Sequence, residues 1–407
     1  MNPVAGQNLL VITEVFYPEE FLVNDLVFGW QAEGRRVTVL TRNPSYPAGR
    51  IYPGFRNRLF TRGEIRGIRV HRVQFIPGYK ENRFIKILNY LWNMLLGIFW
   101  ALKNGRNFDA VCMVQTGPLT FSAIGVLIGR MYRKRTVIWT QDVWPETVFA
   151  YGVAQRGIAR RVLECFVRWV YRGCDRIAVS SPGFIPLLQR HVPGKPITFI
   201  PQWPATVPAG ESAGEFLLPD GFRFVFAGNI GMVQNLENVL LGWEHFQRQA
   251  AAEGAWLIIV GDGSHLSALQ QMVTKRSIPQ VVFTGRVPAR SMPAVYCQSD
   301  VLVISLDDRP VFNMTIPAKF QAYLEAGRPM FGVIAGEVAS LISRHTLGRV
   351  ADPNNPAAIS REFETLFRTP AGDLKNFSAH AATLLEETFS RDRSVAALTR
   401  LVSPNAE

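Results

Sequence analysis

The feature that most constrains this chain is a repeated alternation of short apolar runs with longer segments of helical spacing. This rhythm is typical of βαβ units, which build a parallel sheet flanked by helices. A proline-rich break from Pro193 to Pro208 interrupts the alternation, and Phe222–Ala227 restarts it. With 407 residues, the chain is long enough for two domains that each bury a core. We therefore predict an α/β chain of two doubly wound, Rossmann-like domains.

The expected strands fall into two sets. The first set is Asn8–Thr13, Arg36–Leu40, Ala110–Val114, Arg135–Trp139 and Arg176–Ser180, and the second is Phe222–Ala227, Trp256–Val260, Val281–Thr284, Val301–Ile304 and Met330–Val333. We place the first domain at residues 1–195, a linker at 196–220, the second domain at 221–375, and in 376–407 a C-terminal helix that packs back toward the first domain. Ligands of doubly wound sheets bind outside the carboxyl ends of the strands, so chemistry is expected in the cleft between the domains.

Basic residues are concentrated in the first half of the chain. Residues 1–190 hold 26 Lys and Arg against 12 Asp and Glu, whereas the remainder holds 18 against 20. A basic half predicts an anionic partner, which is a nucleic acid, an anionic membrane or a phosphorylated substrate. No nucleic-acid partner is expected, since no recognition motif accompanies the basic residues.

The cysteines and the N-terminus indicate the compartment. Cys112, Cys165, Cys174 and Cys297 have neither paired CxxC spacing nor the density of a disulfide scaffold, and we interpret them as reduced structural thiols. No basic segment precedes the first apolar run, so no signal peptide is predicted. We therefore expect cytoplasmic residence.

Residues 87–102 break the soluble pattern because they include no charged residue. The segment is short for a membrane span. Lys86, Asn89, Asn93 and Gly97 draw one polar or small stripe along an otherwise apolar helix. Two interpretations stay open: a buried core helix, or shallow insertion into an anionic leaflet. Under the second interpretation, the membrane-contacting side chains are Trp92, Leu95, Phe99 and Trp100.

Glycine turns follow strands of the second half. Phe224–Ala227 runs into one turn ahead of a helix expected from about Asn235, and Ile258–Val260 runs into another. Such turns let backbone amides approach a diphosphate, and a following helix start adds partial positive charge. A tight turn without a ligand is the alternative. The expected phosphate-binding residues are Gly228, Asn229, Ile230, Gly231, Gly261, Asp262 and Gly263.

Two cations can complete an anion site beside these turns. Pro317 opens a predicted helix that puts Lys319 in its first turns and ends at Gly327. A lysine gains nothing from the dipole at a helix start, so a bound anion would explain its presence. Arg286 follows the strand Val281–Thr284 and can neutralise a phosphate. For both cations, a solvated side chain is the alternative.

Carboxylates follow strands of the first half. Asp142 comes after Arg135–Trp139, and at the rim of the sheet it can accept a proton from a hydroxyl group. The alternative is a capping aspartate ahead of Pro145. Glu14 and Glu19 bracket the loop after the first strand and are further candidates for contacts to hydroxyl groups.

Taken together, these motifs resemble glycosyltransferase family 4. In the second half the series is Ala227-Gly-Asn-Ile-Gly231, Ile259-Val-Gly-Asp-Gly263, Phe283-Thr-Gly-Arg-Val287, Ile316 to Pro329, and Gly336-Glu337. One branch of that family works in bacterial surface-polysaccharide assembly and includes amino-sugar transferases of the fucosamine type. The segments similar to that branch are Tyr17-Pro-Glu-Glu-Phe21, Asn24-Asp25, Val37 to Thr41, Ser45 to Gly49 and Gln141 to Glu146.

The resemblance implies a GT-B fold and retaining transfer from a nucleoside-diphosphate sugar, UDP-linked in our interpretation, with no obligatory metal. The second domain would bind the donor through the glycine turns and Arg286, Lys319, Glu325, Gly336 and Glu337. The first domain would bind the acceptor through Glu14, Tyr17, Glu19, Asn24 and Trp144. The catalytic residues would be Asp142, Lys319 and Arg286.

The chain departs from the family pattern at two places. The Glu-x7-Glu pair of many members falls on Met314 and Ala322, so the usual ribose carboxylate is missing. Glu325 lies three residues further on and is the candidate substitute, with a surface glutamate as the alternative. The arginine and lysine that many members place after the glycine turn are absent from Met232 to Glu237, which shifts phosphate binding to the two cations named above.

The leading hypothesis is a glycosyltransferase on the inner face of the plasma membrane. It would add a sugar, such as an N-acetylated deoxyhexosamine, to a polyprenyl-diphosphate-linked glycan of an exopolysaccharide, capsule or O-antigen. The basic first domain and the helix around Trp92 would then meet the anionic membrane and the diphosphate of the acceptor. The alternatives are a nucleotide-sugar 2-epimerase of GT-B-like fold and an inactive scaffold protein of polysaccharide assembly.

Overall fold

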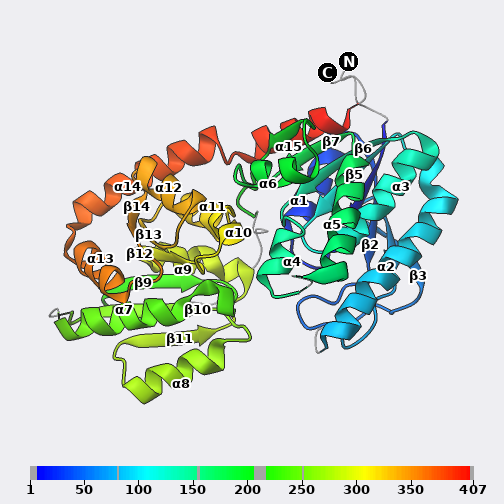
Figure 1. Cartoon of the computed structure of the whole chain (residues 1–407). Helices are drawn as coiled ribbons and strands as arrows, with labels where there is room; N and C mark the ends of the chain where they lie inside the picture. The colour runs from blue at the N-terminus through cyan, green and yellow to red at the C-terminus, as the bar shows by residue number, and fades with distance from the viewer. Residues whose placement is uncertain (1–6, 80–81, 154–155, 206–216, 250–251, 404–407) are drawn as a thin grey trace. The chain divides into compact units, whose positions relative to one another are not determined.

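The computed structural model describes residues 7–79, 82–153, 156–205, 217–249 and 252–403. The chain divides into two compact units (Figure 1). One unit is formed by Met1–Pro201 together with Asp392–Glu407, and the other by Gln202–Arg391. The last helix of the chain therefore belongs to the first unit.

The first unit is built on an eight-stranded sheet with the order β3-β4-β2-β1-β5-β6-β7-β8. The strands are β1 (Asn8–Thr13), β2 (Arg36–Arg42), β3 (Phe60–Ile65), β4 (Ile68–Val73), β5 (Ala110–Gln115), β6 (Arg135–Thr140), β7 (Arg176–Val179) and β8 (Ile197–Phe199). The helices are α1 (Leu22–Ala32), α2 (Arg83–Asn104), α3 (Ala123–Tyr132), α4 (Glu146–Ala150), α5 (Gly157–Arg172), α6 (Phe184–His191) and α15 (Arg391–Val402), with the 3-10 turns η1 (Gly105–Asn107) and η2 (Leu119–Ser122). Neighbouring strands run parallel except in the β3–β4 hairpin at one edge.

Helices α1 and α15 lie together on one face of this sheet. The Trp30 indole nitrogen donates to Thr399 Oγ1 (2.8 Å), and Arg135 Nε donates to the carbonyl of Leu401 (2.8 Å). Because both faces are covered, the inner strands are apolar on both sides, as Leu10 in β1 illustrates with no exposed surface. The C-terminal helix thus completes the first unit although it follows the second in sequence.

Helices α2, α3 and α5 lie on the opposite face. These helices connect strands in the direction of β8, whereas α1 connects β1 to β2 in the direction of β3. Since such crossovers are right-handed, the two directions put the helices on opposite faces of the sheet. Helix α3 lies between the other two: Ile124 of α3 fills the place of a side chain at Gly97 of α2, and Val126 of α3 fills that at Gly173, directly after α5. The three helices form one layer.

Helix α2 turns Asn89 and Asn93 inward. The amide of Ile76 donates to Asn89 Oδ1 (2.8 Å), and Asn93 Nδ2 donates to the carbonyl of Gln74 (2.6 Å). Both asparagines are buried, and these bonds satisfy polar groups of the chain that follows β4. The apolar side of the helix is left facing outward. Its exposed side chains, which we call the α2 outer stripe, are Phe84, Ile87, Leu88, Leu91, Leu95, Phe99 and Leu102.

The second unit is built on a six-stranded parallel sheet with the order β11-β10-β9-β12-β13-β14. The strands are β9 (Phe222–Ala227), β10 (Ala255–Val260), β11 (Val281–Gly285), β12 (Val301–Ser305), β13 (Met330–Val333) and β14 (Gly348–Ala351). The helices are α7 (Leu236–Gln249), α8 (Leu266–Arg276), α9 (Met292–Gln298), α10 (Pro310–Asn313), α11 (Ala318–Ala326), α12 (Glu337–Arg344), α13 (Pro356–Arg368) and α14 (Ala371–Glu387), with the 3-10 turns η3 (Met232–Gln234) and η4 (Ala289–Ser291).

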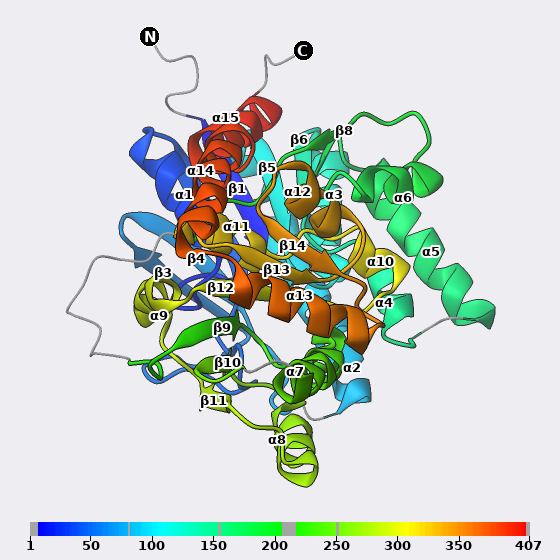
Figure 2. The ribbon, with the colours of Figure 1, turned by 90° about the vertical axis from the view of Figure 1, so that its left-hand side faces the viewer.

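The core of the second unit is aromatic where α7 and α13 lie side by side (Figure 2). The rings of Phe224, Trp243 and Phe363 meet edge to face, with centroids 4.9 to 5.8 Å apart. Aromatic pairs in this geometry add stability beyond the area they bury. They hold both helices against β9, whose carboxyl end opens the first glycine turn.

The predicted α/β architecture of two doubly wound sheets is confirmed. All ten predicted strands are present, with bounds within two residues of those expected. The apolar pattern did not predict β3, β4, β8 and β14. Strands β3 and β8 lie at a sheet edge and are largely exposed, β14 is short, and Arg and His interrupt the apolar residues of β4.

Candidate active site

Each sheet has one point where the order of strand connections reverses. In the first unit this switch point lies between β1 and β5, and in the second between β9 and β12. Doubly wound folds bind ligands outside the carboxyl ends of the strands at this point. The residues that follow these strands are Glu14 and Thr116 in the first unit, and Gly228 and Leu306 in the second.

The two glycine turns of the second unit pack against each other. The amide of Ile230 donates to the carbonyl of Asp262 (2.9 Å). A Cβ on Gly261 would lie 1.9 Å from the carbonyl oxygen of Gly228, and a Cβ on Gly263 would lie 2.2 Å from that of Ile230. Gly261 and Gly263 are thus required for contact between the turns, which is a different reason from the expected approach of a ligand.

The first turn keeps two amides available. Among the residues that the structure describes, the amides of Asn229 and Gly231 make no hydrogen bond, and Gly228 and Asn229 are exposed. Helix α7 then begins at Leu236, close to its predicted start. Amides at an exposed turn ahead of a helix are suited to phosphate oxygens.

Lys319 points at this turn from the start of α11. Its Nζ donates to Gln234 Oε1 (2.5 Å), lies 3.8 Å from the centroid of the Phe226 ring, and would be 3.4 Å from a Cβ on Gly228. Burial lowers the pKa of Lys319 to about 7. No described carboxylate forms an ion pair with it. A largely buried ammonium with an amide and a ring as neighbours lacks a counter-charge, which a bound phosphate would supply.

Arg286 and Glu337 follow other strands at the same carboxyl edge. Arg286 comes after β11 and is exposed. Since β11 is two strands from β9, the backbone of Arg286 lies about 10 Å from that of Gly228, within reach of a long side chain. Glu337 opens α12 after Gly336, whose φ is 74° and where a Cβ would lie 1.9 Å from the carbonyl oxygen of Asn313.

The position of Glu325 does not favour its expected role in ribose binding. Helix α11 begins at the carboxyl edge and runs back toward the start of β13. Glu325 lies six residues after Lys319, about 9 Å further along the helix axis. It is exposed, and its carboxylate is, after burial, a cause of the raised pKa of Tyr296 in α9. Ala322, at the family position of the ribose carboxylate, is partly buried.

Sequence reasoning missed a pair of aspartates directly after β12. The amide of Asp307 donates to the carbonyl of Val233 in η3 (2.9 Å), and the carboxylate of Asp308 accepts from Asn313 Nδ2 (2.7 Å) and Asn354 Nδ2 (3.0 Å). Both therefore lie at the switch point of the second unit. The available signal was two carboxylates that follow a buried strand. Among the described residues, no group of three or more His, Cys, Asp or Glu could hold a metal ion.

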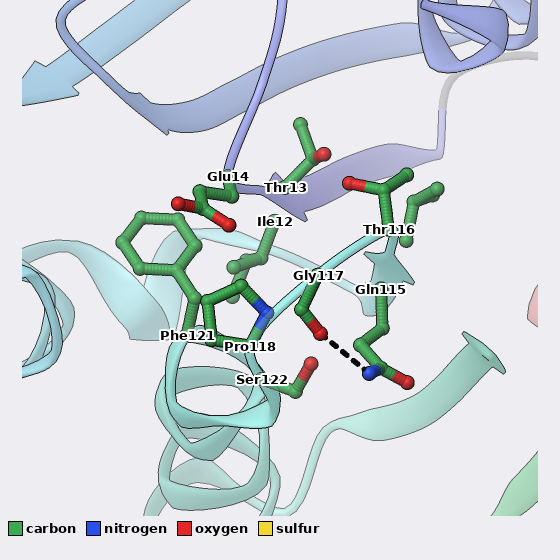
Figure 3. Close-up of a pocket in the computed structure, with 10 residues that line it drawn as sticks. Ile12, Thr13, Glu14, Gln115, Thr116, Gly117, Pro118, Phe121 and Ser122 are labelled. Atoms are coloured by element: carbon green, nitrogen blue, oxygen red, sulfur yellow. Dashed lines mark hydrogen bonds between the residues drawn. The ribbon is translucent and has the colours of Figure 1, made fainter. Parts of the chain in front are cut away.

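The switch point of the first unit forms a pocket (Figure 3). The Glu14 carboxylate and the Phe121 ring lie on one side of it and the Gln115 amide on the other. Gln115 Nε2 donates to the carbonyls of Gly117 (2.7 Å) and Asp142 (2.7 Å), which joins the ends of β5 and β6. The lining residues are Ile12, Thr13, Glu14, Val114, Gln115, Thr116, Gly117, Pro118, Phe121 and Ser122.

Asp142 lies beside this pocket, two residues after β6. Burial raises the pKa of its carboxyl to about 6, although hydrogen bonds from Thr147 and Trp144 oppose the shift. The residue keeps some exposed surface. A carboxylate whose pKa is close to neutrality is suited to accept a proton from a hydroxyl group.

The buried Arg42 holds both Glu14 and Glu19. Its Nε lies 3.4 Å from Glu14 Oε1 and its second terminal nitrogen 3.9 Å from Glu19 Oε1. Glu19 is buried and accepts the amides of Ser45 (2.8 Å) and Tyr46 (2.6 Å). The burial of Glu19 does not favour its expected contact with an acceptor, and its carboxylate fixes the loop after β2. The Glu14 side chain remains 14% exposed and lines the pocket.

Asn24 also forms its hydrogen bonds within the chain instead of offering them to an acceptor. Its Oδ1 accepts the amide of Tyr17 (3.0 Å) and its Nδ2 donates to the carbonyl of Glu19 (2.7 Å). The Tyr17 side chain is exposed and Trp144 is partly buried. Of the expected acceptor contacts, Glu14, Tyr17 and Trp144 keep the access that the role requires.

Tyr90 of α2 belongs to the same region and was not predicted. Burial raises the pKa of its hydroxyl, and the nearby carboxylates of Glu14 and Asp142 raise it further. The sequence did not indicate a role for this residue, because a tyrosine within an apolar run is typical of a core helix or a membrane helix.

The expected membrane-contacting residues divide between the two sides of α2. Leu95 and Phe99 lie in the α2 outer stripe, at 47% and 66% exposure. Trp92 is partly buried, and Trp100 is a buried core residue because the inward asparagines turn it toward the sheet. By length and composition alone, one described segment, Phe84–Asn107, is apolar enough to cross a membrane, with a mean hydropathy of 1.4.

Two family models match the chain. Residues 22–203 match a glycosyl transferase 4-like domain, and residues 221–369 match glycosyl transferases group 1. The chain is 23% identical over 303 residues to a Pseudomonas aeruginosa protein named as glycosyltransferase WbjE, which covers 72% of each chain. It is 22% identical over 310 residues to WcaI of Escherichia coli strain K12, named as a colanic acid biosynthesis glycosyl transferase, which covers 73% of this chain and 74% of the other.

Two solved structures have the same fold. Sucrose-phosphate synthase from Thermosynechococcus elongatus superposes with a TM-score of 0.70 at 15% identity, over 98% of both chains. HepE from Anabaena in complex with UDP superposes with a TM-score of 0.65 at 12% identity, over 97% of this chain and 98% of the other. The fold is GT-B, as predicted, and the protein is a glycosyltransferase enzyme. It carries group 1 and 4-like domains, and one of its relatives is named for polysaccharide biosynthesis.

Proposed function

We propose that the protein transfers a sugar from a nucleoside-diphosphate sugar to a polyprenyl-diphosphate-linked glycan, with retention of configuration, during surface-polysaccharide synthesis in bacteria. The reaction takes place at the inner face of the plasma membrane. The observation that carries the proposal is Lys319, a largely buried cation with no described counter-charge, aimed at a glycine turn with free amides. A diphosphate supplies the missing charge.

The donor is a UDP-sugar, and an N-acetylated deoxyhexosamine is the sugar that the resemblance favours. UDP is the ligand of the structurally similar HepE. Its phosphate oxygens accept from the amides of Asn229 and Gly231 and from Lys319, with Arg286 as a second cation. When the bond between the anomeric carbon and the diphosphate breaks, the electron pair leaves with the diphosphate, and Lys319 stabilises the developing charge.

The acceptor hydroxyl reacts at the first unit. Its oxygen bonds to the anomeric carbon on the face that the leaving group vacates, and its proton passes to Asp142. Glu14 accepts hydrogen bonds from neighbouring sugar hydroxyls in the pocket, while Gln115 holds the ends of β5 and β6 together through its two donated bonds. Tyr90 of α2 interacts electrostatically with Glu14 and Asp142, which supports a role for one residue of α2 near the reacting sugar.

The acceptor reaches the pocket from the membrane along α2. Tyr90 lies on the inner side of this helix while the α2 outer stripe faces outward. The exposed Lys86, Lys103 and Arg106 flank the stripe and favour an anionic leaflet. A glycan on a lipid diphosphate can occupy the pocket while its lipid stays in the bilayer.

The test is transfer by the purified protein with a panel of nucleotide sugars and polyprenyl-diphosphate glycans, followed by mass spectrometry of the lipid-linked product. The expected result is a glycan longer by one sugar together with free nucleoside diphosphate. An epimerised donor formed without any acceptor would indicate the epimerase instead. Neither transfer nor nucleotide release, combined with unchanged surface polysaccharide in cells carrying Lys319→Ala, would indicate an inactive scaffold.

A further inference from the structure

Helix α5 has an exposed apolar side that the proposed reaction does not use. Ile158 is 79% exposed and Val162 is 61% exposed, and Cys165 is exposed as well. Their spacing of three and four residues puts them on one side of the helix with Trp169. The opposite side of α5 packs on its own unit through Val167, Val170 and Tyr171. We call Ile158, Val162, Cys165 and Trp169 the α5 outer stripe.

Basic side chains border the α5 outer stripe. Helix α5 holds Arg160, Arg161, Arg168 and Arg172 against the single acid Glu164, which pairs with Arg160 (2.8 Å). Helix α2 holds three basic residues and no acidic one. An apolar strip bordered by arginines fits the boundary between acyl chains and anionic headgroups. Two copies of the same face would instead bring like charges together.

The α5 outer stripe and the α2 outer stripe belong to one layer of the first unit. Helix α3 separates the two helices and contacts both: Ile124 of α3 packs at Gly97 of α2, and the Arg130 guanidinium of α3 lies 5.1 Å from the Trp169 ring centroid. Half of the residues of α3 are buried. The two long helices therefore lie on the same face of the sheet (Figure 1), and each has exposed apolar side chains.

We propose that α5 is a second membrane-docking element, which together with α2 holds the first unit on an anionic bilayer. A single interfacial helix leaves the protein free to rotate about the axis of that helix. Contact through two helices fixes the orientation of the pocket relative to the leaflet, which a lipid-borne acceptor requires. This inference rests on the membrane-borne acceptor of the proposed function.

The experiment measures binding of the full-length protein to vesicles of phosphatidylethanolamine and phosphatidylglycerol by co-sedimentation. Ile158→Glu with Val162→Glu is expected to weaken binding about tenfold or more, and Arg161→Gln about fivefold. Leu217→Glu in the second unit is the control, because Leu217 is 77% exposed and the substitution likewise replaces an exposed apolar side chain with a carboxylate. Vesicles of phosphatidylcholine alone should bind every variant weakly, since they carry no net negative charge.

Two further measurements separate the outcomes. Leu91→Glu with Leu95→Glu tests α2 alone, and transfer to a water-soluble acceptor glycan tests the chemistry without a membrane. If the α2 variant loses binding and the α5 variant binds like the unaltered protein, the role of α5 is overturned while the proposed function stands. If the α5 variant instead dissociates a dimer in light scattering and still binds vesicles, the α5 outer stripe is an interface between copies. If the unaltered protein transfers no sugar to the soluble acceptor, the result counts against the proposed function and leaves the membrane-docking role of α5 to the vesicle experiment.

Discussion

The two switch-point regions have the same backbone arrangement but differ in whether a charged side chain beside the switch point has a counter-charge within the chain. In the first unit, Glu14 follows β1 and Asp142 follows β6, the strands on either side of β5, and Arg42 lies close to Glu14. In the second unit, Lys319 faces an amide oxygen, an aromatic ring and a glycine turn. The first region thus has an ion pair within the chain, whereas the cation of the second region has no described carboxylate as its counter-charge. The comparison teaches that a ligand of little charge suits the first region and an anionic ligand suits the second.

The largest expected effect tests the first region. Asp142→Asn keeps the shape of the side chain and removes the base, so transfer should fall by about 10² to 10⁴. Initial rates with saturating donor and acceptor measure the loss. Asp220→Asn, at a fully exposed carboxylate, is the control and should leave the rate unchanged. A rate equal to that of the unaltered protein would show that Asp142 only caps the loop after β6.

The next effect tests the second region. Lys319→Ala should lower transfer by about 10² to 10³, because it removes the charge that meets the leaving diphosphate. UDP affinity, measured by calorimetry, should fall with it. Lys275→Ala removes an exposed lysine from α8 of the same unit and should change neither quantity. If Lys319→Ala binds UDP as tightly as the unaltered protein, Lys319 is not the cation that favours an anionic ligand in the second region.

A third prediction concerns the scaffold that holds the second region. Gly261 has a φ of 137°, and a Cβ there would lie 1.9 Å from the carbonyl oxygen of Gly228. Gly261→Ala should lower the free energy of unfolding of the second unit by about 1–3 kcal/mol or more, from backbone strain and steric overlap. Gly254→Ala, at a φ of 83° with no atom within 4 Å, should have a smaller effect in the same urea titration. Equal midpoints would mean that the turns are not in tight contact.

The smallest effect is in the pH profile, where the two regions set opposite limits. Asp142 accepts a proton only when ionised, so kcat/KM should fall up to tenfold per pH unit below about 6. The lowered pKa of Lys319 leaves it neutral above about 7 in the free enzyme, so the same quantity should fall on that side as well. In Lys319→Arg, the fall of kcat/KM on the alkaline side should move to higher pH, because a guanidinium stays protonated. An alkaline limb identical in both proteins would exclude Lys319 as its source.

The sequence predicted the fold and the edges at which the sites lie. Apolar runs of four to six residues fix buried strands, since such runs are stable only between two layers of helices. Chain direction then places Gly228, Lys319 and Asp142 at carboxyl ends. Glu19 could not be interpreted in the same way, because its partners Ser45 and Tyr46 come from the loop after β2. Asn24 instead bonds within its own loop, a local contact that the apolar pattern does not reveal.

The apolar segment around Trp92 is a case that the sequence alone did not decide. Its residues alone determined a helix with one polar stripe, and that stripe is equally suited to face water or to face buried backbone groups. Only the tertiary structure decided the matter, because the carbonyl of Gln74 and the amide of Ile76 lie where Asn93 and Asn89 can satisfy them. A buried polar group without a partner is costly, so these two bonds turn the asparagines and Trp100 inward and leave Leu91 and Leu95 exposed.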